Sequence, residues 1–168
     1  IESGLFGTSG VNPKEHDETP TDGKIAGFAK IGGRDVAVVV NDFTVKGAST
    51  SATNGKKVGH MKRTATERGM PFVVIGESTG ARLPDAMGAR GMGQLLGNDN
   101  TQFRRTRETP MVAGVVGPSF GSSAWLACLS DFSVMVKGAT MAVSSTRLIE
   151  MALNEKVDLE ELGGWRLH

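Results

Sequence analysis

VVIGESTGAR (residues 73–82) and VVGPSFGSSAW (residues 115–125) decide the fold that we expect for this chain. Each stretch begins as an apolar run typical of a buried strand and ends in small residues that lead toward a helix. The first turn of a helix exposes backbone N–H groups that have no partner within the helix. Two such turns side by side can direct N–H donors at one oxygen atom, as in an oxyanion hole. The spacing leaves a second interpretation open, in which glycine only avoids steric clashes in two ordinary turns.

The composition is that of one globular domain with a core. Of its 168 residues, 39% are hydrophobic and 22% are charged, and the net charge of +1 gives no sign of nucleic-acid binding. Cys128 is the one cysteine, which excludes a disulfide framework. No apolar run approaches the ~20 residues of a membrane-spanning helix. Ile1 rather than Met stands first, which leaves an upstream targeting segment open.

Strand-like and helix-like segments alternate along the chain, and this alternation predicts an α/β fold with mainly parallel strands. Residues 1–23 show little periodicity and are expected to form an irregular arm. The Gly32-Gly33 pair predicts a hairpin between the first two apolar runs. The expected strands are residues 24–31, 36–40, 72–75, 111–116 and 132–136. The expected helices are residues 50–68, a broken segment over 85–107, residues 122–129 and residues 146–153.

Side-chain chemistry is sparse. The three histidines (His16, His60 and His168) lie far apart in the sequence, so no metal site is expected. The serine-rich second turn lacks the G-x-S-x-G pattern of a nucleophile, and neither common nucleotide-binding glycine motif occurs. Four carboxylates stand where capping of N–H groups is the expected role: Asp42, Glu77, Asp85 and Asp131. The sequence therefore favours a site in which backbone N–H groups, rather than side chains, act on the substrate.

Several short motifs, kept in order, resemble one known family. ESTGAR (residues 77–82) is similar to its N/D-S-G-G-A-R segment, and GPSFGSS (residues 117–123) to its G-P-x-x-G-G-A segment. DFTV (residues 42–45), DFSVMV (residues 131–136) and EELGG (residues 160–164) also match. The chain thus resembles the N-terminal half of the carboxyltransferase (beta) subunit of biotin-dependent acyl-CoA carboxylases, such as propionyl-CoA carboxylase.

This resemblance implies a crotonase-like (Clp/crotonase) fold of stacked ββα units over residues 24–168, after the arm of residues 1–23. In the family, the substrate site lies between the N-terminal fold of one subunit and the C-terminal fold of another. The resemblance therefore implies a homo-oligomer with sites between subunits. It also implies that residues 1–168 alone are inactive, because the half of the site that receives biotin is absent.

The implied reaction moves a carboxyl group from carboxybiotin to the α-carbon of an acyl-CoA through an enolate. The freed biotin nitrogen takes the α-proton, so no protein side chain acts as the base. By resemblance, the N–H groups of Gly121 and Ser122 hold the thioester oxygen, and Gly80 and Ala81 line the thioester. The implied cofactor-binding residues, with Arg82 also bracing its loop, are Gly47, Ala48, Ser49, Lys57, Thr79, Arg82 and Phe120.

The implied cofactor is biotin on a partner carrier domain, and the implied substrate is an acyl-CoA. The implied partners are a biotin carboxylase and a biotin carrier subunit, with no nucleic acid, no membrane and no metal, in the cytoplasm or a mitochondrial matrix. Alternatives stay open: a biotin-dependent acyl-CoA decarboxylase, a non-catalytic scaffold subunit, or a crotonase-type hydratase or isomerase. A hydratase or isomerase of this type has a glutamate at the position of Trp125. A Clp-type protease requires a serine at the position of Gly121.

Overall fold

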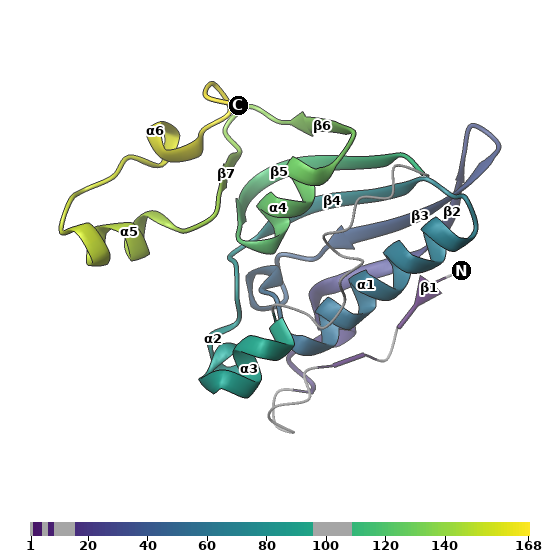
Figure 1. Cartoon of the computed structure of the whole chain (residues 1–168), viewed down its shortest axis with the longest axis horizontal. Coiled ribbons are helices and arrows are strands. Elements are labelled where there is room, and N and C mark those ends of the chain that lie inside the picture. Colours follow the sequence, from purple (N-terminus) through teal and green to yellow (C-terminus); the bar gives the residue numbers. More distant parts are fainter. Residues whose placement is uncertain (1, 5–6, 9–15, 96–108) are drawn as a thin grey trace.

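A seven-stranded sheet is the centre of the molecule (Figure 1). The structure, a computed structural model, describes residues 2–4, 7–8, 16–95 and 109–168. The strands run in the order β1-β2-β3-β4-β5-β6, and β7 pairs with the end of β5. Strands β1, β2 and β3 are antiparallel, whereas β3 to β6 are parallel. The strand bounds are β1 Glu2–Ser3, β2 Lys24–Ile31, β3 Arg34–Asn41, β4 Phe72–Ser78, β5 Met111–Phe120, β6 Phe132–Met135 and β7 Thr140–Ala142.

Short helices connect the strands. The 3₁₀ segments are η2 Pro20–Gly23 and η3 Lys46–Ala48, and the α-helices are α1 Ala52–Glu67, α2 Leu83–Ala86, α3 Gly88–Leu95, α4 Ser122–Leu129, α5 Thr146–Leu153 and α6 Leu159–Gly163. The expected hairpin at Gly32-Gly33 and the expected helices α4 and α5 are confirmed. The broken helix expected over residues 85–107 is present as α2 and α3, and its remainder, from residue 96, lies outside the described residues.

Strands β4 and β5 each continue several residues past their apolar runs. The ladder between them reaches Ser78 and Ser119, which are paired in register. Small polar residues continue the pairing because the ladder uses backbone groups. As a result, the two glycine turns leave neighbouring strands at the same edge of the sheet.

The main core lies between one face of the sheet and the helices α1 and α4, which cover that face together (Figure 1). Met61 of α1 packs with Val39 and Phe72 of the sheet. Ala127 of α4 packs with Ala113 and Val115 of β5 in a second cluster. Within the described residues, no helix has both the length and the apolar character needed to cross a membrane.

The arm expected over residues 1–23 contains local structure at both ends. The two-residue strand β1 pairs with β2, and η2 closes the arm. Thr19 and Asp22 are fully buried. The end of the arm is therefore part of the domain interior.

Candidate active site

The two glycine turns meet beyond the carboxyl ends of β4 and β5. Gly80 and Gly121 both have positive φ values, of 95° and 64°. A methyl group added to Gly121 would lie 3.7 Å from the Gly80 Cα, and one added to Gly80 would lie 3.6 Å from the Phe120 Cβ. These are ordinary van der Waals distances, so the positive φ values are what favours glycine at both positions.

The second turn offers N–H groups at the start of α4. Gly121 is the N-cap residue, and it donates its own N–H to the Ala142 carbonyl of β7 at 3.3 Å. Among the described residues, no acceptor takes the N–H of Ser122 or Ser123. The expected donor pair of Gly121 and Ser122 needs a correction, because the Gly121 N–H is engaged and Ser122 is the first residue whose N–H is available.

The first turn offers one donor as well. Thr79 donates to the Gly47 carbonyl at 3.0 Å, and Gly80 donates to the Ser78 hydroxyl at 3.2 Å. Ala81 forms a parallel bridge with Thr50. In this bridge the Thr50 N–H donates to the Gly80 carbonyl, and the Arg82 N–H donates to the Thr50 carbonyl. Successive N–H groups of an extended chain point to opposite sides. The Ala81 N–H therefore points away from Thr50, and no acceptor for it lies in the described part of the chain.

The side chain of Ser122 has a definite position. Its hydroxyl oxygen lies 2.8 Å from the Thr50 hydroxyl oxygen. This hydrogen bond directs the Ser122 hydroxyl toward the loop that precedes α1. The sequence contains no signal for the pair, because its members lie 72 residues apart.

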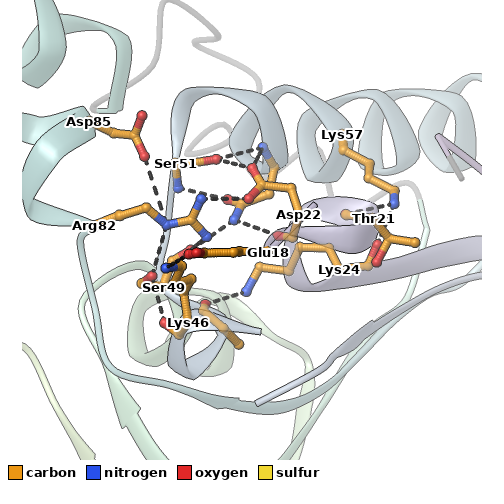
Figure 2. A network of polar contacts seen from close by, with 12 residues as sticks. Glu18, Thr21, Asp22, Lys24, Lys46, Ser49, Ser51, Lys57, Arg82 and Asp85 are labelled. Carbon is orange, nitrogen blue, oxygen red and sulfur yellow. Dashed lines mark hydrogen bonds and ion pairs between the residues drawn. The ribbon is translucent and has the colours of Figure 1, made fainter. Parts of the chain in front are cut away.

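A buried polar network holds the first turn in place (Figure 2). Arg82 donates to the Asp22 carboxylate at 2.6 Å, and its other nitrogens donate to the Ser49 hydroxyl at 3.1 Å and the Ser49 carbonyl at 3.2 Å. Asp22 also accepts from the Ser51 hydroxyl and from the Asn54 N–H. Arg82 braces its loop as expected. Its guanidinium is buried in this network.

The other residues expected to contact CoA separate into two groups. Ala48 and Ser49 are buried, and the Lys57 ammonium, on α1, donates to the carbonyls of Gly4, Thr21 and Lys24. These positions give the three residues a structural role. A second group lies at the surface or partly exposed beside the turns: Gly47, Thr79 and Phe120. Gly47 packs so closely on Thr79 that an added methyl group would lie 2.6 Å from the Thr79 Cγ2.

Lys24 is a site residue that the sequence reading missed. At the start of β2 it reads as an ordinary strand-end lysine, yet the residue is only 5% exposed. Its ammonium donates to the Ala48 carbonyl at 2.9 Å. Burial lowers the pKa of Lys24 from 10.5 to about 7, while the Asp22 carboxylate raises it and the Arg82 guanidinium lowers it.

No group of His, Cys, Asp and Glu side chains in the described residues could hold a metal ion.

Comparison with known proteins identifies the class. The carboxyl transferase domain family matches residues 5–168, so the chain belongs to that family. It is 36% identical over 157 residues to an uncharacterized carboxylase, YngE, of Bacillus subtilis, covering 90% of this chain and 30% of that protein. It is 32% identical over 155 residues to the propionyl-CoA carboxylase beta chain of Roseobacter denitrificans, again covering 90% and 30%.

Among solved structures, the chain is similar to the transcarboxylase 12S hexamer with methylmalonyl-coenzyme A and methylmalonic acid bound. The TM-score is 0.83 and the identity 31%, covering all of this chain and 33% of that one. The expected crotonase-like α/β fold is confirmed. The chain spans about a third or less of the length of these relatives.

Proposed function

We propose that this chain supplies the acyl-CoA half of a carboxyltransferase that carboxylates the α-carbon of an acyl-CoA. The observation that carries the proposal is the pair of facing turns. One presents the N–H of Ser122 and the other the N–H of Ala81, without acceptors in the described residues. Such donors stabilise the oxygen of a thioester as it gains negative charge in an enolate.

Each residue then has a distinct task. Ser122 and Ala81 donate to the thioester oxygen, while Gly80 and Gly121 supply the positive φ values of the two turns. Gly47, Thr79 and Phe120 line the adjacent edge, where the CoA portion would lie. Trp125 occupies the position of a hydratase glutamate and cannot transfer a proton, which supports carboxyl transfer over hydration.

The wider setting also belongs to the proposal. A biotin group on a carrier partner would supply the carboxyl group, a biotin carboxylase would reload it, and the assembly would be a homo-oligomer in the cytoplasm. Support comes from the relatives named above, of which one is a propionyl-CoA carboxylase chain and one a hexamer with methylmalonyl-coenzyme A bound. The site described above accounts for the acyl-CoA only, and none of its residues is assigned to biotin.

Substitution of Ser122 by proline tests the proposal in the full-length protein. Ser122 is the first residue of α4, a position that accepts proline, so the change removes the N–H while the helix is retained. We expect the rate constant kcat for carboxyl transfer to fall by about 100-fold. Ser122→Ala is the matched control, because it removes the hydroxyl and keeps the N–H, and its kcat should stay near the unsubstituted value. A folded Ser122→Pro protein with full kcat would contradict the assignment.

A further inference from the structure

A pocket lies between α1 and α4, above the sheet face that both helices cover. The residues Thr50, Ser122 and Ser123 stand at one side of it, beside the start of α4. Most of the remaining wall is apolar and is formed by Val58, Val74, Trp125, Leu126 and Leu129.

Lys24 supplies the one charged side chain among the described residues that line the pocket. No carboxylate of the described residues forms an ion pair with its ammonium, whose partner is the neutral carbonyl of Ala48. The nearby Asp22 carboxylate binds Arg82, Ser51 and the Asn54 N–H instead. Buried charges in proteins are normally paired, because an isolated charge loses its hydration without compensation. Burial lowers the pKa of Lys24 to about 7, although the nearby Asp22 carboxylate raises it.

The two amide side chains of the pocket wall are already hydrogen-bonded. The Asn54 amide donates to the carbonyls of Asp22 and Ser49 and accepts from the Ser51 N–H. The Asn41 amide donates to the Glu77 carbonyl at 2.9 Å. An ammonium group can donate three hydrogen bonds, and the Lys24 ammonium donates one to the Ala48 carbonyl. It can therefore donate further hydrogen bonds to the oxygen atoms of a ligand.

We propose that this pocket is a subsite for the acyl chain, and that it selects acyl groups whose far end carries a carboxylate, bound by the Lys24 ammonium. The inference rests on the proposed function, since Ser122, whose N–H is assigned to the thioester oxygen, is one of the residues that line the pocket. An acyl chain that begins at this N–H can extend along the apolar wall, and its terminal carboxylate supplies the charge that Lys24 lacks. A methyl-terminated chain leaves that ammonium uncompensated.

Two matched thioesters test this selectivity in the full-length protein: hexanoyl-CoA, and adipoyl-CoA, which has the same length and ends in a carboxylate. The KM values are measured below pH 7, where Lys24 is protonated. We expect adipoyl-CoA to have the lower KM by at least about tenfold, and Lys24→Met to abolish this difference.

A second variant keeps the test valid if Lys24→Met fails to fold. Gly55 of α1 lines the pocket, and a methyl group added there meets no atom within 4 Å. Gly55→Leu should place its side chain in the pocket and raise the KM of both six-carbon thioesters, relative to acetyl-CoA, by at least about tenfold. Lys56→Leu places the same side chain on the exposed neighbouring position and should leave all three KM values unchanged.

The outcomes separate the two proposals. Turnover of acetyl-CoA combined with equal KM values for the six-carbon pair, or with no effect of Gly55→Leu, would overturn the subsite and leave the proposed function standing. Absence of turnover with all three thioesters would overturn the proposed function and the subsite together.

Discussion

At the residue scale, the ion pair between Asp22 and Arg82 determines how firmly the first turn is held. Both side chains are buried, and they lie 60 residues apart in the sequence. Arg82→Met should lower the free energy of unfolding by about 3–5 kcal/mol, because it leaves the Asp22 carboxylate buried without its counter-charge. Urea denaturation measures this change. Lys30→Met is the control, since it breaks the exposed pair with Asp35 and should cost less than about 1 kcal/mol. Equal losses in the two variants would contradict the buried pairing.

The titration of Lys24 predicts how stability depends on pH. Between pH about 7 and 10.5 the unfolded chain carries the Lys24 proton and the folded chain does not. The unfolded state then binds more protons, so the Lys24 contribution to the free energy of unfolding rises with pH across this window and is flat below it. The two charged groups that act on Lys24 are Asp22, which opposes the shift, and Arg82, which increases it. Denaturation at several pH values should show a smaller rise in Lys24→Met. A rise of the same size would show that Lys24 titrates normally.

At the element scale, the start of α1 depends on a reciprocal cap. The Ser51 hydroxyl accepts from the Asn54 N–H, and the Asn54 side chain accepts from the Ser51 N–H. The same hydroxyl donates to Asp22, which connects the helix to the buried network. Ser51→Ala should therefore lower the free energy of unfolding by about 1–2 kcal/mol, as measured by thermal or urea denaturation. Asp158→Ala at the exposed cap of α6 provides the comparison and should cost less. The opposite order would argue against the coupling of α1 to the network.

Elements set by local patterns could be predicted from the sequence, whereas contacts between distant segments could not. Helix α4 has the bounds that its apolar run indicates, and β2 begins and ends as expected. The engagement of the Gly121 N–H depends on β7 pairing with β5, which places Ala142 beside the turn. Likewise, the burial of Lys24 depends on elements that pack around it from elsewhere in the chain. Such features arise from tertiary packing, which short-range periodicity does not contain.

At the scale of the whole molecule, one sheet face remains apolar and exposed. Side chains alternate between the faces of a strand, so Ile75, Val116 and Val134 lie opposite the face that α1 and α4 cover. Their exposed fractions are 36%, 45% and 52%. Beyond β7, α5 and α6 project away from the sheet (Figure 1), and α5 exposes Leu148 and Met151 as well.

Contiguous apolar surface of this kind drives association in water. The chain of residues 1–168, prepared alone, should therefore sediment as concentration-dependent assemblies rather than as one monomeric species. The double substitution Val116→Lys and Val134→Lys places two charges on the sheet face. It should raise the monomer fraction, because association would then bury unpaired ammonium groups. Lysines at Thr44 and His60, which are uncharged, exposed and outside this face, add the same two charges as a control and should leave the distribution unchanged. If the control pair dissolves the assemblies equally well, net charge is responsible and the apolar sheet face is not the contact.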